Sequence, residues 1–194
     1  MPIIPTTKVL RKRDPHDFYP TPLSLCRAAL AELPPAPVPD SILDPGAGSG
    51  VWGKAARDLY PRALITGVEL RPDAIPPAET YTAWHTGDFR LYDPGWKHDL
   101  IMGNPPYKYA EAFIRHSLSM LKDYGWLVFL LRLAFLEEQD RGKDFWRKFP
   151  PERVSVCSQR PSFTGDGNTD ATAYAVYYWR KGWTGPTRLD WLRW

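Results

Sequence analysis

The sequence predicts an α/β fold in which helices cover both faces of a mostly parallel sheet. Two observations support this prediction. Segments with helix-like and strand-like periodicity alternate from residue 22 to residue 131, and such alternation implies right-handed crossovers between parallel strands. Towards the C-terminus the alternation stops, because 153–157 and 171–179 have the pattern of two strands with no helix between them. We expect these two strands to form an antiparallel hairpin on the edge of the sheet.

The individual elements follow from periodicity and from start and stop signals. A first helix is predicted over 22–33, where apolar residues recur at helical spacing behind Thr21, a capping residue type, and Pro22 in the first turn. The next segments are predicted as strands over 41–44, 63–69, 81–84, 99–103 and 125–131, and as helices over 51–59 and 109–121. With the C-terminal pair these make seven strands, and the predicted fold is Rossmann-like.

Length and composition indicate one globular domain over residues 1–194, long enough to bury its own core. Hydrophobic residues make up 43% and charged residues 24%, which excludes wholesale disorder and a fibrous protein. The apolar stretch 126–136 is broken by Arg132 and is shorter than the ~20 residues that span a bilayer. A signal-peptide pattern is absent, and Cys26 and Cys157 cannot frame a secreted scaffold. We therefore expect a cytoplasmic protein without a membrane segment.

Charge is concentrated at the two ends of the chain. The net charge is +3, with +4 in residues 1–13 and +3 in residues 180–194, which leaves −4 for the part between them. A polyanion-binding protein can use such ends to hold phosphates, and solvated tails have the same composition. We expect a basic N-terminal arm over 1–16 and a Trp- and Arg-rich tail over 182–194.

A glycine-rich turn, Asp44-Pro45-Gly46-Ala47-Gly48-Ser49-Gly50, joins a predicted strand to a predicted helix. Glycine allows positive φ and a close approach of the backbone to a ligand, and the helix start offers N–H donors. Gly48, Gly50 and Gly53 also satisfy GxGxxG, and Glu69 follows at the distance expected of a ribose-binding acid. The turn therefore indicates a nucleoside-containing ligand and does not by itself separate a dinucleotide from another nucleoside.

Two acidic positions favour a cofactor that ends in an amino acid. Asp44 closes its strand where a carboxylate can meet an ammonium group, and a pyrophosphate there would be repelled. Asp88 and Phe89 offer an acceptor for an adenine amine beside an aromatic face, although a capped turn with a core phenylalanine has the same pattern. These features suit S-adenosylmethionine.

The sequence Asn104-Pro105-Pro106-Tyr107 directly follows a predicted strand, at the edge where open α/β sheets bind ligands. An amine conjugated to a ring or carbonyl is a poor nucleophile because its lone pair is delocalised. The Asn104 amide oxygen and the Pro105 carbonyl can each accept one of its hydrogens and localise the lone pair for attack on a sulfonium methyl group. The prolines restrict the backbone, and Tyr107 offers a flat face to a planar group.

These segments together resemble the amino-methylating DNA methyltransferases, in particular the small phage-type adenine-specific enzymes. The resemblance covers residues 17–181. It rests on Asp-Phe-Tyr-Pro-Thr-Pro at 17–22, the glycine turn at 44–50, Asn-Pro-Pro-Tyr at 104–107 and Arg-Pro-Ser-Phe at 160–163. It implies a methyltransferase fold, S-adenosyl-L-methionine as the cofactor, DNA as the partner, and methyl transfer to the exocyclic amine of adenine. The base must then be flipped out of the duplex or presented in a single strand.

The resemblance also implies roles for single residues. It assigns catalysis to Asn104, Pro105, Pro106 and Tyr107, and stacking of the target base to Tyr107 and Phe163. It assigns cofactor binding to Phe18, Tyr19, Thr21, Asp44, Pro45, Gly46, Ala47, Gly48, Gly50, Glu69, Asp88 and Phe89. The chain departs from the family in one respect, because about fifteen residues follow the last predicted strand, so we expect no separate target-recognition domain.

Other functions remain open at this point. Asn-Pro-Pro-Tyr also occurs in enzymes that methylate protein glutamine or guanine in RNA, and the glycine turn fits a dinucleotide-dependent oxidoreductase. A silent nucleic-acid-binding module is a further alternative. We expect no metal site, because the histidines and cysteines lack ligand spacing, and the calcium-like segment 166–177 has Ala171 and Tyr177 where glycine and glutamate are required.

Overall fold

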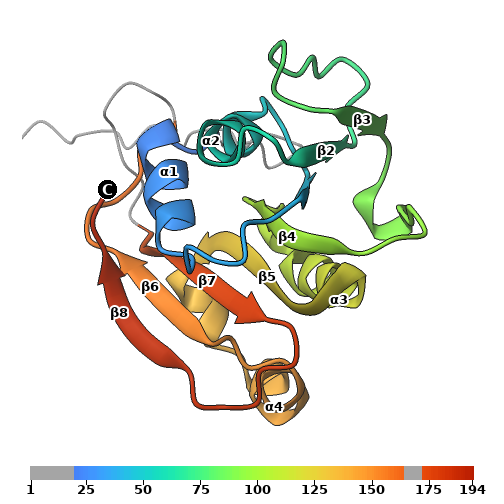
Figure 1. The fold of residues 1–194 in the computed structure, drawn as a ribbon. Helices are drawn as coiled ribbons and strands as arrows, with labels where there is room; N and C mark the ends of the chain where they lie inside the picture. Colours follow the sequence, from blue (N-terminus) through green and yellow to red (C-terminus); the bar gives the residue numbers. More distant parts are fainter. Residues whose placement is uncertain (1–19, 164–171) are drawn as a thin grey trace, which may run out of the picture.

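The structure is a computed structural model that describes residues 20–163 and 172–194, and one sheet runs through them (Figure 1). The strands are β1 (Ser41–Pro45), β2 (Leu64–Glu69), β3 (Ala83–Thr86), β4 (His98–Gly103), β5 (Leu121–Arg132), β6 (Arg153–Cys157), β7 (Tyr174–Arg180) and β8 (Arg188–Leu192). The α-helices are α1 (Leu23–Ala31), α2 (Val51–Leu59), α3 (Ala110–Met120) and α4 (Trp146–Lys148). Short 3-10 turns cover Phe89–Leu91, Tyr107–Tyr109 and Leu133–Leu136, and a π-helical turn at Arg141–Phe145 leads into α4.

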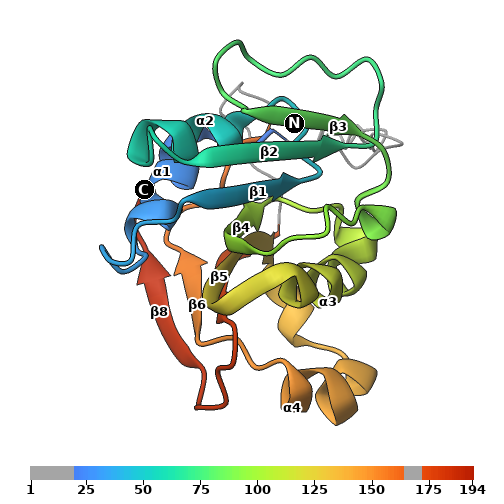
Figure 2. The same cartoon turned by 45° about the vertical axis from the view of Figure 1, so that its right-hand side comes forward.

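The strand order across the described sheet is β3-β2-β1-β4-β5-β7-β6-β8. Strands β3 to β5 in this order are parallel, β7 is antiparallel to both β5 and β6, and β8 is parallel to β6. The chain first moves outward from β1 to β3 and then returns to place β4 on the other side of β1. Loops separate at such a switch and leave a crevice at the carboxyl ends of the strands. Figure 2 shows the arrowheads of β1, β2 and β3 directed to that edge.

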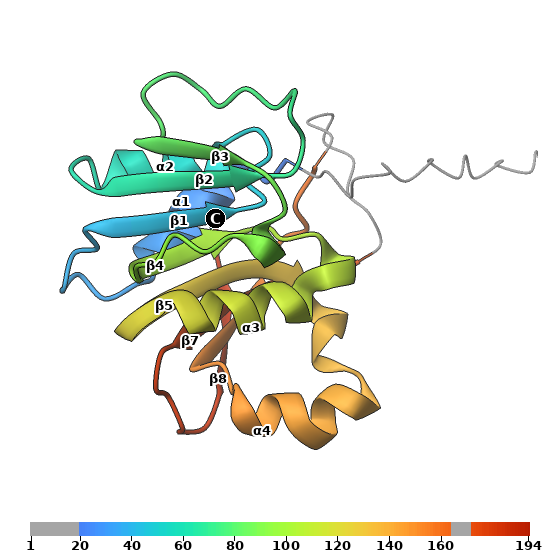
Figure 3. The same ribbon diagram turned by 90° about the vertical axis from the view of Figure 1, so that its right-hand side faces the viewer.

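The core has two halves, one on each face of the sheet. Successive strand residues point to opposite faces, so Ile42 and Leu100 pack towards α1 and α2, while Leu43 and Ile101 pack towards α3. Figure 3 shows α3 and α4 on one side of the sheet and the other two helices behind it. None of the helices within residues 20–163 and 172–194 has the length and apolar character that crossing a membrane requires.

The predicted fold class is confirmed, since the sheet is mostly parallel with antiparallel C-terminal strands. Two details of the prediction are corrected. The sheet has eight strands where seven were expected, and the antiparallel pair does not form its edge. Strand β7 is apolar or aromatic along nearly its whole length, and such a sequence is typical of a strand covered on both faces. It lies between β5 and β6, where nearly all of its residues are buried. The additional strand is β8, which belongs to the tail 182–194 and forms the outer edge.

The tail therefore packs on the sheet instead of extending as a free segment. Leu192 is buried, and the Trp194 ring packs against the core on the α1 and α2 side. Its indole N–H donates to the Gln159 carbonyl at 3.3 Å. Trp191, by contrast, is 69% exposed, so this part of the tail presents one aromatic ring to solvent.

Candidate active site

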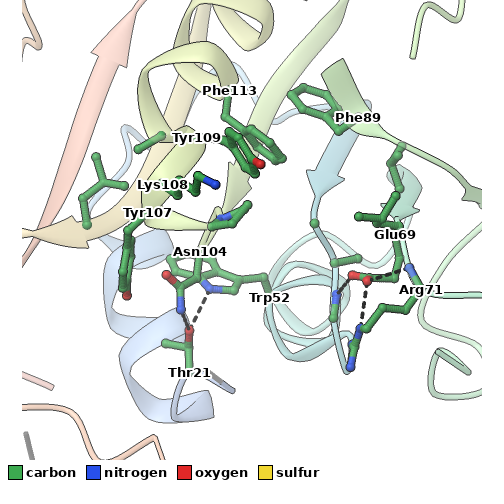
Figure 4. Close-up of a pocket in the computed structure, with 18 of the residues that line it drawn as sticks. Thr21, Trp52, Glu69, Arg71, Phe89, Asn104, Tyr107, Lys108, Tyr109 and Phe113 are labelled. Carbon is green, nitrogen blue, oxygen red and sulfur yellow. Dashed lines mark hydrogen bonds and ion pairs between the residues drawn. The ribbon is translucent and has the colours of Figure 1, made fainter. Parts of the chain in front are cut away.

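A cavity of about 740 Å³ opens at the carboxyl edge of the sheet, within the size range of small-molecule sites (Figure 4). It is lined from the glycine turn, the end of β2, the segment after β3, the segment after β4 and the end of β5. The predicted site residues in its wall are Thr21, Gly46, Ala47, Gly48, Glu69, Asp88, Phe89, Asn104, Pro106 and Tyr107. Segments far apart in the sequence thus meet in one cavity.

Other predicted site residues do not contribute to this wall. Among the described residues these are Asp44, Pro45, Gly50, Pro105 and Phe163. Phe18 and Tyr19, predicted to bind the cofactor, lie outside the described residues.

The glycine turn has the backbone geometry that its sequence predicts. Gly46, Gly48 and Gly50 have φ of 67°, 58° and 78°, which is the left-handed region that glycine adopts without strain. A Cβ atom on Gly50 would come within 2.6 Å of the Cδ atom of Pro77. The turn is also tied to β2, because the Gly46 N–H donates to the Val68 carbonyl at 2.8 Å. The bare backbone of the turn is therefore held firmly against the cavity.

Glu69 ends β2 and is 6% exposed, with its carboxylate in the cavity wall. One oxygen accepts from the Gly48 N–H at 2.7 Å, and the other accepts from the backbone N–H and the Nε–H of Arg71 at 3.0 and 2.9 Å. A carboxylate has about four acceptor positions. Three of these acceptor positions are used here, so about one is left for a ligand hydroxyl group. Movement of Arg71 would release two more.

Asp44 makes structural contacts within the protein. Its side chain is 1% exposed, and one carboxylate oxygen accepts from the Gly53 N–H at 3.1 Å and from the Tyr81 hydroxyl at 2.7 Å. Burial raises the pKa of Asp44 to about 7, although both hydrogen bonds act in the opposite direction. The carboxylate connects β1 to the first turn of α2 behind the glycine turn. These contacts of one oxygen lie within the protein, and the predicted contact of Asp44 with a cofactor ammonium group stays a prediction.

Asp88 and Phe89 both lie in the cavity wall. The Asp88 carboxylate forms an ion pair with Arg90, with 2.5 Å between the carboxylate Oδ2 and a guanidinium nitrogen. The hydrogen bonds from Arg90 lower the pKa of Asp88. The Phe89 ring is 2% exposed and packs against Phe113 with ring centroids 4.8 Å apart. Phe89 is thus both a core residue and part of the cavity wall, which joins the two interpretations that the sequence left open.

The Asn104 side chain is held by residues from two other segments. Its Nδ2 donates to the Thr21 Oγ1 at 3.3 Å, and the Trp52 indole N–H donates to the same oxygen at 3.3 Å (Figure 4). Thr21, which was assigned to the cofactor, is therefore in direct contact with the predicted catalytic asparagine. Trp52 was not singled out from the sequence, although its position two residues after the glycine turn is a signal that could have identified it.

The Tyr107 ring lies in the cavity wall beside a cation. The Arg132 Cζ atom lies 4.9 Å from the centre of this ring, and Arg132 itself lines the cavity at the end of β5. In the sequence, Arg132 is recognisable only as a break in an apolar stretch. A single charged residue at the end of a buried strand was the available signal for a functional position.

Phe163 lies one ring further from the cavity than its predicted role requires. Phe163 is 8% exposed, and its ring packs edge to face with the Tyr174 ring, with centroids 5.0 Å apart. The centroid of the Tyr174 ring in turn lies 6.0 Å from that of the Tyr107 ring. The predicted pair of rings around a target base, Tyr107 and Phe163, is therefore separated by Tyr174 in this structure. Stacking of Phe163 on a target base stays a prediction.

The cavity wall fits a nucleoside cofactor at the positions that the structure describes. Glycine backbone without Cβ atoms adjoins an acid whose oxygens can accept from ribose hydroxyls, and Phe89 provides apolar surface for a base. Together, the strand order and this location of the cavity define the class I, Rossmann-like methyltransferase fold.

Comparison with solved structures supports this fold. A protein from Listeria monocytogenes described as a class I S-adenosylmethionine-dependent methyltransferase has a TM-score of 0.72 at 18% identity, covering 91% of this chain and 66% of its own. The methyltransferase subunit of a type I restriction-modification system from Streptococcus thermophilus has a TM-score of 0.67 at 16% identity, covering 86% of this chain and 45% of its own.

Sequence comparison finds partial relatives, and no protein-family profile matches the chain. The type II methyltransferase M.CvrRI of Paramecium bursaria Chlorella virus XZ-6E is 34% identical over 86 residues, which is 43% of this chain and 23% of the relative. The type II methyltransferase M.TthHB8I of Thermus thermophilus is 34% identical over 107 residues, 53% of this chain and 24% of the relative. A release factor glutamine methyltransferase of Koribacter versatilis is 34% identical over 87 residues, 41% of this chain and 31% of the relative.

The matched regions thus span about a quarter to a third of the length of these curated relatives. Together with the structural neighbours, the relatives imply S-adenosyl-L-methionine as the cofactor.

Proposed function

We propose that this protein transfers the methyl group of S-adenosylmethionine to the exocyclic amine of adenine in DNA. The observation that carries the proposal is that Asn104, Pro106 and Tyr107 line the same cavity as Gly48 and Glu69. An amine brought to the first group of residues would lie beside a nucleoside held by the second group. Similarity to type II methyltransferases supports DNA as the substrate.

Asn104 is the group that we assign to the amine. Its Nδ2 is turned to Thr21, so the amide oxygen lies on the other side of the group, nearer Tyr107 in Figure 4. An amide oxygen in this position accepts a hydrogen from the target amine, and the Pro105 carbonyl is assigned the second one. Two such acceptors weaken the conjugation of the nitrogen lone pair with the ring. The cofactor, when bound, supplies a sulfonium methyl group, which a neutral amine can attack.

Tyr107 is the residue that we assign to the target base. One face of its ring is next to Arg132, so a base would stack on the opposite face or displace the guanidinium. Stacking on one aromatic ring contributes about 1–3 kcal/mol, which offsets part of the cost of flipping a base out of a duplex. Phe163, whose ring packs against Tyr174, is the second ring that we assign to the base.

Contacts with the DNA backbone are assigned to basic residues at the site. Arg90, Lys108 and Arg132 line the cavity, and the basic arm over 1–16 lies outside the described residues. Their charges would bind phosphates in a salt-dependent manner. We further propose that residues 1–194 act as one methyltransferase domain.

A second acceptor class is protein glutamine or RNA guanine. Similarity to a release factor glutamine methyltransferase favours this alternative, because its acceptor is also a conjugated amide nitrogen. The relatives and structures described above are methyltransferases, which favours a sulfonium cofactor over the dinucleotide of an oxidoreductase.

Transfer of tritiated methyl groups to DNA, RNA and protein in parallel tests the proposal. We expect labelled DNA for the wild-type protein and at least about a hundredfold lower rate for Asn104→Ala, the usual size of the loss of one oriented polar group. Binding of S-adenosylhomocysteine to Asn104→Ala should remain within about threefold of wild type, because Glu69 and the glycine turn are unchanged. If only protein or only RNA became labelled, DNA would not be the substrate. Full activity of Asn104→Ala would contradict the catalytic role assigned to Asn104.

A further inference from the structure

Three segments converge on one hydroxyl group next to the cavity. Thr21 precedes α1, Trp52 lies in the first turn of α2, and Asn104 follows β4. The Trp52 and Thr21 side chains are only 4% and 5% exposed. The Trp52 indole N–H and the Asn104 Nδ2 each lie 3.3 Å from the Thr21 Oγ1, and Figure 4 draws both hydrogen bonds.

The donor and acceptor inventory gives this arrangement a direction. An indole N–H can only donate, whereas a hydroxyl group has two lone pairs that accept and one O–H that donates. In the structure both Trp52 and Asn104 donate to the Thr21 oxygen. The Trp52 donor therefore fixes one lone pair of Thr21, and this sets the orientation of the Thr21 side chain. The other lone pair receives the nitrogen end of the Asn104 amide. Because the two ends of an amide have nearly the same shape, only such hydrogen bonds determine which end faces a ligand.

We propose that Trp52 is a positioning residue for methyl transfer, which acts on Asn104 through the hydroxyl group of Thr21. Trp52 holds the hydroxyl, the hydroxyl holds the amide nitrogen, and the amide oxygen is thereby presented to the acceptor amine. The inference rests on the proposed function in one respect, since it takes Asn104 as the group that contacts the acceptor.

Packing of the Trp52 ring is a separate role that the test must exclude. The ring belongs to the core between α1, α2 and the sheet, and it also lines the cavity next to the glycine turn. Trp52→Phe keeps an aromatic ring at this position and removes the N–H donor. Thr21→Val keeps the shape of the threonine and removes the hydroxyl, whereas Thr21→Ser keeps the hydroxyl.

Steady-state kinetics of these variants provide the first test. We expect kcat to fall about 3- to 10-fold in Trp52→Phe and about 10- to 30-fold in Thr21→Val, with the KM for the acceptor within about twofold of wild type. Thr21→Ser should recover most of the rate lost in Thr21→Val. The double variant Trp52→Phe/Thr21→Val should be no more than about twofold slower than Thr21→Val alone, because both changes break the same chain of contacts.

Trp179→Phe is the matched control. The Trp179 indole N–H donates to the Phe149 carbonyl at 3.0 Å, and this buried residue of β7 does not line the cavity. Its substitution also removes one indole hydrogen bond from the core, so it should lower the unfolding temperature and leave kcat unchanged. A loss of kcat in Trp179→Phe equal to that in Trp52→Phe would reduce the effect of Trp52 to general stability and overturn the proposal.

NMR spectra of the protein provide a readout that needs no acceptor. The Trp52 indole and Asn104 amide signals can be assigned by their loss in Trp52→Phe and Asn104→Asp. We expect Thr21→Val to shift both signals, and Trp52→Phe to shift the Asn104 signals. If DNA is not methylated, the proposed function fails while these shifts still establish the connection between the three residues. Unchanged Asn104 signals in Thr21→Val, or multiplicative rate losses in the double variant, would contradict the positioning role.

Discussion

The stability of this protein should depend on pH through two buried groups that act in opposite directions. Burial raises the pKa of the Asp44 carboxyl from 3.8 to about 7, and burial lowers the pKa of the His98 imidazole from 6.5 to about 4. Asp44 accepts from Tyr81 and Gly53, while the His98 Nδ1 lies 2.9 Å from the Ser41 Oγ. We predict that removal of one group reveals the pH dependence caused by the other.

The two signs follow from proton counts. Between pH 3.8 and 7 the folded state holds a proton on Asp44 that the unfolded state has lost, so stability falls as pH rises. At about 1.4 kcal/mol per pH unit this amounts to about 4 kcal/mol. Between pH 4 and 6.5 the unfolded state holds a proton on His98 that the folded state lacks, so stability rises with pH by about 3 kcal/mol. The two changes therefore oppose each other between pH 4 and pH 6.5 in the wild-type protein.

Asp44→Asn removes the titration and keeps an acceptor of the same size. We expect the free energy of unfolding of this variant to rise by about 3 kcal/mol from pH 4 to pH 6.5, and to rise more steeply than that of the wild-type protein. His98→Gln should show the opposite trend, with stability that falls over the same range. Urea titrations followed by tryptophan fluorescence at several pH values measure both. Parallel profiles of Asp44→Asn and wild type would refute the reasoning, because Asp44 would then be ionised in the folded state.

Three further predictions concern the cavity and its turn. Glu69→Gln should weaken S-adenosylhomocysteine binding at least about tenfold in calorimetry, because a neutral amide accepts more weakly from ribose hydroxyls; unchanged affinity would place the ribose elsewhere. Gly50→Ala should lower the free energy of unfolding by about 1–3 kcal/mol in urea titrations, because of its φ of 78° and the contact with Pro77, whereas Gly142→Ala, with open space around it, should lose nothing; equal losses would contradict this. Arg132→Ala should raise the KM for an oligonucleotide about tenfold and reduce the salt dependence of binding by about one phosphate contact, with cofactor affinity retained; a salt dependence equal to wild type would exclude a phosphate contact.

The sequence was sufficient to predict the elements around the cavity and their meeting point. Periodicity placed α2 at 51–59, where the structure has Val51–Leu59, and predicted β4 to end at Gly103, directly before Asn104. Because parallel strands end on the same edge of a sheet, the segments after β1, β2 and β4 had to converge. This reasoning needs only local patterns and one topological rule, and the cavity lies at the predicted edge.

The arrangement of the last strands could not be predicted in the same way. Whether β7 follows β6 at the edge or inserts beside β5 depends on which partner covers both of its faces, and this is a non-local choice. Its nearly complete burial was visible in the sequence as the uninterrupted apolar and aromatic run Tyr174–Trp179. Strand β8 has only five residues, and two of them are charged, so its pattern does not distinguish it from an irregular tail.

The direction of single side chains was a second limit. Asp44 lies two residues after Ile42 and therefore points to the same face of the sheet, towards α1 and α2. This alternation was available in the sequence, but the place of Asp44 at the carboxyl end of its strand favoured a ligand contact. Contacts such as Trp52 with Thr21, or Arg132 with Tyr107, join positions far apart in the sequence, so only the folded structure reveals them.

The central claim is that Asn104 presents an acceptor oxygen to the amine of adenine. Mass spectrometry of nucleosides from DNA incubated with the protein and S-adenosylmethionine tests it most directly. Our account predicts N6-methyladenine with the wild-type protein and none above background with Asn104→Ala. A methylated cytosine, a methylated glutamine in place of any methylated base, or equal N6-methyladenine from both proteins would contradict it.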